Sequence, residues 1–166
     1  MNMILSGGKG AGKTTVCERV ASRSVHAGGV ITPRGNEGTE AVDLLTGEGR
    51  ELTRKKPGDG KWMPVGNRFI SERGLNFANQ AISDAIYDPR CQLIVIDEIG
   101  ILEIRGMGLI VNTINALSSG KHNLLAVRES VKKDFLLKYG MYRFHILELN
   151  ENNRDEVTGV LIDLLG

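Results

Sequence analysis

The chain has 166 residues, of which 41% are hydrophobic and 25% are charged, and its formal net charge is +1 at pH 7. This length and composition predict one globular domain with a single hydrophobic core. The near-zero charge gives no reason to expect a nucleic-acid partner, and no apolar run reaches the ~18 residues that a membrane span needs. We expect a cytoplasmic protein without a signal peptide, in which Cys17 and Cys91 are reduced thiols.

The first residues combine a strand, a glycine-rich turn and a helix. Residues 3–5 are an apolar run typical of a buried strand, and the apolar spacing after residue 13 predicts a helix. Between them, residues 7–14 match the pattern G-x-x-x-x-G-K-[ST]. The order of the three elements is the one that a phosphate-binding loop requires, so we expect the chain to bind a nucleoside triphosphate.

Each position of this loop has a physical role. Its backbone N–H groups can converge on an anion at a helix N-terminus, whose dipole favours negative charge. Lys13 is expected to lie along the β- and γ-phosphates, Thr14 to bind Mg²⁺ through its hydroxyl, and Thr15 to reach the α-phosphate. The predicted phosphate-binding residues are Gly7, Gly8, Lys9, Gly10, Ala11, Gly12, Lys13, Thr14 and Thr15.

After the first helix, residues 26–29 contain a glycine stop signal, and residues 30–32 predict a short strand. Residues 34–61 are glycine-rich and charged, and they predict an insertion. In it, residues 41–46 can pair with residues 50–54 as a hairpin. The insertion either extends the main sheet as an antiparallel part or forms a flap over the site.

The rest of the chain alternates helices and strands. Helices are expected over about 75–86, 107–119 and 130–139 and after Asn152, and strands over 93–96, 123–128 and 144–149. Such alternation predicts a parallel sheet with right-handed crossovers, whose ligands bind at the carboxyl ends of the strands.

An acidic pair follows the most apolar of these strands. Asp97 ends a buried run, where a carboxylate can hold Mg²⁺ through a water. Glu98 is expected to point the other way, where it can orient and deprotonate a water that attacks the γ-phosphorus. The pair favours hydrolysis, because a small-molecule kinase gains from excluding water.

The charge of the transferred phosphoryl group calls for further cations. Arg128 closes the strand after the acidic one and is expected at the catalytic edge. Arg34 and Lys9 are two more candidates, and each fits a solvated surface cation equally well. The histidines show no zinc spacing, so none is given a catalytic role. They are His26, His122 and His145.

Four segments together resemble a known family, the small nucleoside-triphosphatases of the thermophilic NTPase and cancer-related NTPase type, within the P-loop NTPase superfamily. The segments are Gly7–Thr15, Val30–Pro33, Val95–Gly100 followed by Leu102-Glu103, and Asn153–Asp155. Two departures stand out. Lys9 takes the place of the family's usual proline, and the region 34–40 is shorter and lacks the usual paired arginines.

The resemblance implies a P-loop NTPase fold of the additional-strand, catalytic-glutamate class. This is a three-layer α/β sandwich over residues 1–166 as one domain, with a mostly parallel central sheet and an antiparallel hairpin extension. It implies Mg²⁺-dependent hydrolysis of ATP, GTP and other nucleoside triphosphates to the diphosphate and phosphate. Asn153 and Arg154 either contact the base or hold the last helix. By position, the resemblance adds as nucleotide-contacting residues Leu93, Ile94, Val95, Ile96, Asp97, Glu98, Ile99 and Gly100.

Two other functions stay open at this point. A small-molecule or nucleotide kinase would use residues 34–70 to bind its acceptor, and it would release no phosphate without one. A nucleotide-dependent switch or accessory ATPase would need a partner to stimulate turnover. The sequence does not define the preferred base or the oligomeric state, although it is compatible with a monomer.

Overall fold

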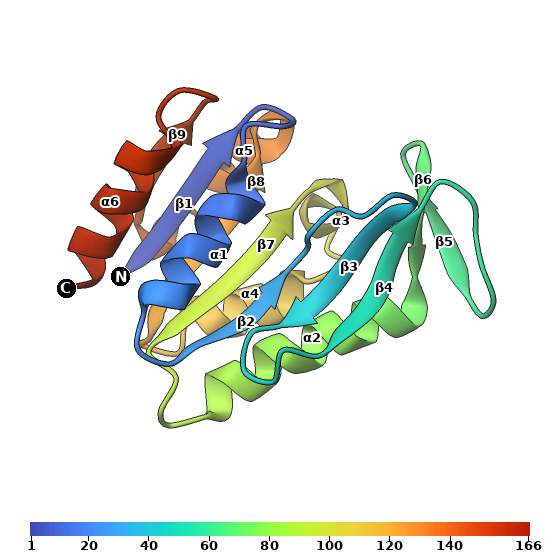
Figure 1. Cartoon of the computed structure of the whole chain (residues 1–166), viewed down its shortest axis with the longest axis horizontal. Coiled ribbons are helices and arrows are strands. Elements are labelled where there is room, and N and C mark those ends of the chain that lie inside the picture. Colours follow the sequence, from blue (N-terminus) through green and yellow to red (C-terminus); the bar gives the residue numbers. More distant parts are fainter.

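A nine-stranded sheet forms the centre of the structure, a computed structural model that describes residues 1–166 (Figure 1). Its strands are β1 (Asn2–Gly7), β2 (Ala27–Ile31), β3 (Gly38–Asp43), β4 (Gly49–Arg54), β5 (Trp62–Val65), β6 (Arg68–Ser71), β7 (Leu93–Ile99), β8 (His122–Arg128) and β9 (Phe144–Leu149). The order across the sheet is β5-β6-β4-β3-β2-β7-β8-β1-β9. Strands β2, β7, β8, β1 and β9 pair in parallel, and β3 to β6 join them by antiparallel pairing.

The parallel part places its carboxyl ends along one edge, at the top of Figure 1. Strand β8 lies between β1 and β7 and pairs with both. Gly7 at the end of β1 is therefore opposite Arg128, and Asp97 in β7 is opposite Ala126. The fold thus brings the end of the first strand and the acidic end of β7 to the same edge, one strand apart.

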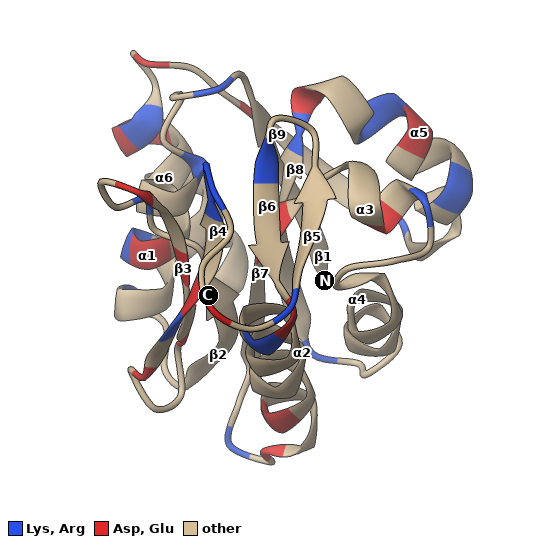
Figure 2. Cartoon of the chain, turned by 90° about the vertical axis from the view of Figure 1, so that its right-hand side faces the viewer, with Lys and Arg blue, Asp and Glu red and all other residues tan.

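Helices cover both faces of the sheet, as the end-on view shows (Figure 2). They are α1 (Lys13–Arg23), α2 (Glu72–Tyr87), α3 (Ile101–Ile104), α4 (Ile110–Leu117), α5 (Glu129–Tyr139) and α6 (Arg154–Leu165), with a 3₁₀ turn over Gly140–Tyr142. Met3 and Leu5 pack into the core under α1 and α6, whereas Ile4 between them packs into the core under α2, α4 and α5. This alternation explains why the parallel strands read as continuous apolar runs, since both of their faces are buried.

The antiparallel part is larger than the sequence indicates. Strands β3 and β4 confirm the predicted hairpin, although β3 begins and ends earlier than the expected 41–46. It extends the main sheet, which decides between the two alternatives for residues 34–61. Strands β5 and β6 were not predicted, because their short and half-exposed segments carry little apolar periodicity. The sheet is mixed and not mostly parallel.

The predicted glycine stop at residues 26–29 is wrong. Helix α1 ends at Arg23, and Gly28 and Gly29 lie inside β2. The position of Gly29 requires a glycine, because its φ is 96° and because it pairs closely with Val95 of β7. Two predicted helix starts also shift: Arg128 and not Ser130 precedes α5, and Asn153 and not Asn152 precedes α6.

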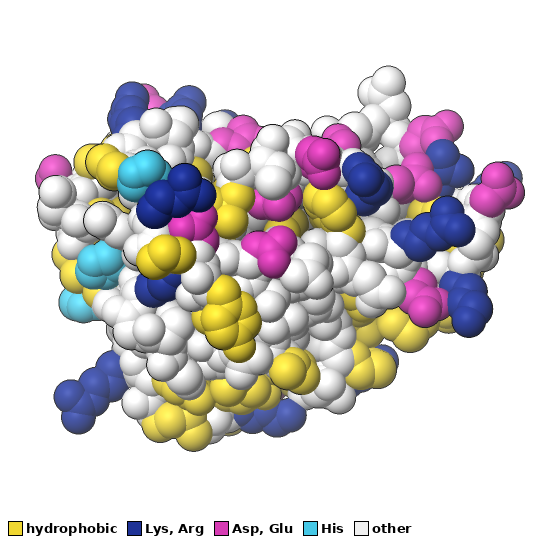
Figure 3. Space-filling view, turned by 90° about the horizontal axis from the view of Figure 1, so that it is seen from below, with side chains coloured by type: hydrophobic (Ala, Val, Ile, Leu, Met, Phe, Trp, Pro, Cys, Tyr) yellow, Lys and Arg dark blue, Asp and Glu magenta, His cyan; other side chains and the backbone are white.

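The end opposite the carboxyl edge mixes charged, apolar and histidine side chains (Figure 3). His26 precedes β2, His122 begins β8 and His145 lies near the start of β9, so all three are at the amino ends of parallel strands. Both cysteines are free and buried. None of the helices combines the length and the apolar character needed to cross a bilayer.

Replacement of Gly29 by alanine should strongly destabilise the fold. The left-handed φ disfavours any side chain, and an added Cβ would clash with the carbonyl oxygen of Val95 in the neighbouring strand. We expect urea denaturation to show a loss of about 3 kcal/mol or more. Gly47→Ala is the matched control: its φ is also positive, at 75°, but nothing lies within 4 Å of the added Cβ, so only about 1–2 kcal/mol should be lost. An equal loss of unfolding free energy in the two variants would show that the clash with Val95 does not contribute.

Candidate active site

The glycine-rich loop connects β1 to α1 and is open to solvent at Gly8, Lys9 and Gly10. Gly12 precedes α1 with a φ of 100°, a conformation that only glycine adopts readily. Lys13 folds back over the loop, and its Nζ donates to the carbonyl oxygens of Gly7 at 2.9 Å and Gly8 at 3.3 Å. The loop therefore carries its own cation at the N-terminus of α1, where an anion is favoured.

Asp97 joins this loop to the end of β7. Its carboxylate is only 1% exposed, and Oδ2 accepts hydrogen bonds from the hydroxyl of Thr14 at 2.7 Å and from the backbone N–H of Thr32 at 3.0 Å. The Thr32 hydroxyl donates to the same oxygen at 3.2 Å. Burial raises the pKa of Asp97, and the hydrogen bonds from Thr14 and Thr32 oppose that rise.

Glu98 leaves the regular strand pairing. The register between β7 and β8 shifts between Asp97 and Ile99, so Glu98 has no partner residue on β8 and is partly exposed. Its Oε1 accepts a hydrogen bond from Nε of Arg128, which forms an ion pair with it. Arg128 therefore lies at the carboxyl edge, as its strand position indicates, and neutralises Glu98.

The turn that follows β7 is fixed by a buried carboxylate. Glu103 is 5% exposed, and its two oxygens accept the backbone N–H groups of Gly100 at 2.9 Å and Leu109 at 3.0 Å. Burial raises the pKa of Glu103, while these two hydrogen bonds lower it. Glu103 thus links the two ends of the segment between β7 and α4. It also fixes Gly100, which is two residues after Glu98.

Arg154, at the start of α6, also reaches the glycine-rich loop. Its Nε donates to the carbonyl oxygen of Ala11 at 2.6 Å, and one of its terminal nitrogens donates to that of Gly10 at 3.1 Å. The sequence leaves its role open between base contact and support of the last helix. In the structure these two contacts link the start of α6 to the glycine-rich loop.

Other predicted residues are not brought together with this group. Leu93 to Ile96 are at most 2% exposed within β7, where their side chains pack into the two cores and are not open at this edge. Lys9 is exposed and forms no ion pair. Arg34 is exposed and lines a polar hollow of about 340 Å³ beside β3 and β4.

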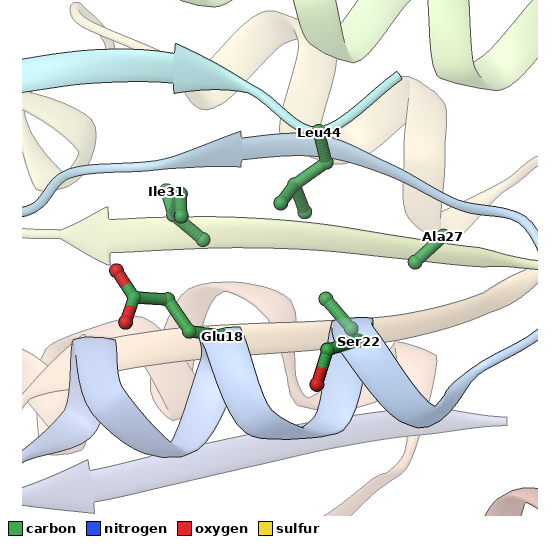
Figure 4. Close-up of a pocket in the computed structure, with 6 residues that line it drawn as sticks. Glu18, Ser22, Ala27, Ile31 and Leu44 are labelled. Atoms are coloured by element: carbon green, nitrogen blue, oxygen red, sulfur yellow. The ribbon is translucent and has the colours of Figure 1, made fainter. Parts of the chain in front are cut away.

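A smaller hollow of about 220 Å³ lies along α1, beyond the loop (Figure 4). Glu18 and Ser22 of α1 line one side, and Ala27, Ile31 and Leu44 line the other. Neither Thr32 nor Asp97 lines this hollow. Its lining is mostly apolar and provides no cationic group.

Thr32 is a site residue that the sequence motifs do not identify. Thr32 follows β2, and β2 pairs in parallel with β7, so the two strands end at the same edge. A hydroxyl residue at that point can reach a carboxylate that follows the neighbouring strand. The sequence does not show that β2 and β7 are neighbours in the sheet, and this contact depends on that pairing.

The loop at the end of β1, the acidic end of β7 and the strand β8 between them define a P-loop NTPase. A family model described as NTPase matches residues 2–162. The chain therefore belongs to this NTPase family, as the resemblance of its motifs indicates.

Individual relatives agree with this membership. The nucleoside-triphosphatase THEP1 of Thermofilum pendens is 34% identical over 142 residues, which cover 77% of this chain and 74% of the relative. The crystal structure of THEP1 from Aquifex aeolicus has a TM-score of 0.79 at 22% identity and covers 99% of both chains. The solution structure of a human cancer-related nucleoside triphosphatase has a TM-score of 0.75 at 19% identity, covering 99% of this chain and 96% of that one. These two structures confirm the α/β fold, and the family confirms the expected class of enzyme, a hydrolase acting on nucleoside triphosphates.

Replacement of Glu103 by glutamine should loosen the turn after β7. One carboxylate oxygen becomes an NH₂ group, which cannot accept from Gly100 or Leu109, so a buried N–H loses its partner. We expect the free energy of unfolding to fall by about 1–3 kcal/mol, measured by urea denaturation. Glu129→Gln, at an exposed position on α5, serves as the control and should change it by less than about 0.5 kcal/mol. An unchanged stability of the Glu103 variant would show that this carboxylate does not brace the turn.

Proposed function

We propose that the protein hydrolyses ATP, GTP and other nucleoside triphosphates to the diphosphate and phosphate in a Mg²⁺-dependent reaction. The observation that carries the proposal is the 2.7 Å hydrogen bond between the hydroxyl of Thr14 and the carboxylate of Asp97. It joins the predicted phosphate loop to the acidic end of β7, next to Glu98. Phosphate-binding, metal-binding and water-activating groups would then meet at one edge of the sheet.

The loop would bind the phosphates through its backbone N–H groups and through Lys13. In the structure the Lys13 ammonium donates to two loop carbonyl oxygens at 2.9 and 3.3 Å. Phosphate oxygens are better acceptors for this cation than neutral carbonyls are, because a charge-assisted hydrogen bond is stronger when both partners are ionised. Lys13 would therefore turn from its own loop to the β- and γ-phosphates.

The donor set of Thr14 and Asp97 fits Mg²⁺. Both offer oxygen, and Mg²⁺ is usually held by one or two protein oxygens together with phosphates and waters. The chain gathers no group of three His, Cys, Asp or Glu that could hold a metal by itself, and this agrees with a metal that arrives with the nucleotide. Thr14 and Asp97 would hold the ion, which when bound neutralises charge on the β- and γ-phosphates.

Glu98 would act as the general base. It would accept a proton from the attacking water as the water oxygen forms a bond to the γ-phosphorus and the bond to the bridging β-phosphate oxygen breaks. Its ion pair with Arg128 supports this role, because a γ-phosphate can attract the guanidinium and leave Glu98 free to accept the proton. Arg128 would then stabilise the charge on the equatorial oxygens.

The same carboxylate favours hydrolysis over transfer to another acceptor. A kinase loses product to hydrolysis if a base activates water beside the γ-phosphate. The two functions separate in one assay: purified protein with a nucleoside triphosphate, and no added acceptor, should release phosphate. Release only after an acceptor is added would favour a kinase.

Replacement of Glu98 by glutamine should remove most hydrolysis and retain nucleotide binding. The amide keeps the size of the side chain but cannot take a proton from water, so kcat should fall by about 100-fold or more. Calorimetry should give a dissociation constant for the Mg²⁺-bound triphosphate close to that of the unchanged protein. Glu48→Gln, in the exposed turn between β3 and β4, is the control and should keep full activity. Unchanged turnover of the Glu98 variant would remove it as the base.

Removal of divalent ions should stop phosphate release. Addition of EDTA in excess should reduce the rate to the background, and Mg²⁺ added beyond the chelator should restore it, because an ion held by Thr14, Asp97 and the phosphates would exchange readily with a chelator. Thr14→Val should require a higher Mg²⁺ concentration for half-maximal rate. A rate that persists in EDTA would contradict the metal requirement.

A further inference from the structure

We infer that Arg154 is a positioning residue that holds the phosphate loop from its outer side, so that the start of α6 forms part of the nucleotide site. The inference rests on the proposed function, because it assigns Arg154 a role in phosphate binding. Arg154 lies 142 positions after Gly12 in the chain and is not part of the loop pattern.

The contacts of Arg154 with the loop are directional. Its Nε donates to Ala11 at 2.6 Å and a terminal nitrogen donates to Gly10 at 3.1 Å, so two successive carbonyl groups point toward one guanidinium. The guanidinium also lies against Gly12, where an added Cβ would be 2.5 Å from Nε. Two hydrogen bonds and a close packing contact therefore fix three consecutive loop residues against Arg154.

The geometry of the peptide bond turns this outer contact into control of the inner face. In a planar trans peptide the C=O and the following N–H point in opposite directions. Holding the carbonyl groups of Gly10 and Ala11 outward thus directs the N–H groups of Ala11 and Gly12 away from Arg154. The N–H of Ala11 points across the loop, where it donates to the carbonyl oxygen of Gly8 at 3.2 Å. The N–H of Gly12 is then the amide that would face the phosphates, because the N–H of Ala11 already has a partner within the loop.

Arg154 is itself held in place by the turn before it. The side-chain oxygen of Asn153 accepts the backbone N–H of Asn150 at 2.8 Å, and its NH₂ group donates to the carbonyl oxygen of Glu148 at 2.9 Å. Behind it, Val157 and Leu161 of α6 are buried in the core that also contains the apolar face of α1. The arginine therefore projects from a rigid base and not from a mobile tail.

Arginine suits this task better than other residues. A guanidinium carries several N–H donors in one plane, so it can satisfy two neighbouring carbonyl groups at once, and it stays charged at every relevant pH. Lysine carries its three donors on one nitrogen, so it cannot match two carbonyl groups with two separate, coplanar nitrogens as a guanidinium does. The positive charge also adds to that of Lys13 beside the bound phosphates.

The test compares Arg154→Ala and Arg154→Lys with Arg19→Gln. Arg19 forms an ion pair with Asp155 that also links α1 to α6 but touches no atom of the loop, so its variant is the matched control. The affinity for a Mg²⁺-bound, non-hydrolysable ATP analogue is measured by calorimetry, and KM and kcat by phosphate release. Exchange of the Val16 amide, which donates to Gly12 at 3.0 Å, reports the order of the loop without nucleotide.

We expect Arg154→Ala to weaken analogue binding by about 10- to 100-fold, as the loss of two charge-assisted hydrogen bonds predicts. In this variant KM should rise as the affinity for the analogue falls, and kcat should change by a smaller factor than KM. The Val16 amide should exchange faster than in the unchanged protein. The affinity of Arg154→Lys for the analogue should lie between those of Arg154→Ala and the unchanged protein. Millimolar guanidinium should partly restore binding by the alanine variant. Arg19→Gln should bind the analogue like the unchanged protein.

Three results would overturn the inference. One is binding by a folded alanine variant within twofold of the unchanged protein. Another is weaker binding with unchanged exchange of the Val16 amide, which would assign Arg154 to direct contact with the nucleotide. The third is an equal effect in Arg19→Gln, which would reduce the role of Arg154 to support of α6. Binding of the analogue is measured without hydrolysis. If the unchanged protein binds the analogue but releases no phosphate, only the proposed reaction is refuted. If the unchanged protein does not bind the analogue, the proposed reaction and the role of Arg154 are both refuted.

Discussion

The buried carboxylate of Asp97 is the contact on which the arrangement of the site depends. A carboxylate that is 1% exposed loses its hydration and is tolerated only when other donors replace the water. Thr14 at the start of α1 and Thr32 after β2 provide those donors, so one oxygen joins three segments that are far apart in sequence. Movement of α1 away from β7 would remove the donor of Thr14, and movement of β2 would remove both donors of Thr32. The geometry of the loop is therefore coupled to the sheet through this oxygen.

The position of β8 explains how the two halves of the site come to lie at this separation. Because β8 pairs with both β1 and β7, the loop and the acidic end are one strand apart. The register shift between Asp97 and Ile99 then gives the two neighbouring acids different surroundings. Asp97 turns toward α1 and is buried, whereas Glu98 is partly exposed beside Arg128. Two carboxylates with different environments can take different chemical roles.

The sequence predicts those parts of the fold that depend on local patterns. The loop pattern, the apolar run of β7 and the stripe of α2 each carry a strong signal within a few residues. What it does not predict depends on contacts between distant segments. The edge strand β5 and its neighbour β6 have no apolar face of their own that periodicity could reveal. Gly29 looks like a helix stop until its approach to Val95 is known. The same limit applies to the site, since Leu93 to Ile96 share a motif with Asp97 but are buried as part of the strand that supports it.

A glycine-rich loop has a cost that the fold must offset. Its glycines allow the backbone to approach phosphates closely, but they also give the free loop more conformational freedom to lose when it binds. In this structure the loop is restrained on three sides: by β1 before it, by the bond between Thr14 and Asp97 after it, and by Arg154 on its outer face. Two of these restraints come from segments far along the chain, so preorganisation of the loop is a property of the whole sheet. A loop restrained in this way would lose less binding energy in becoming ordered around a nucleotide.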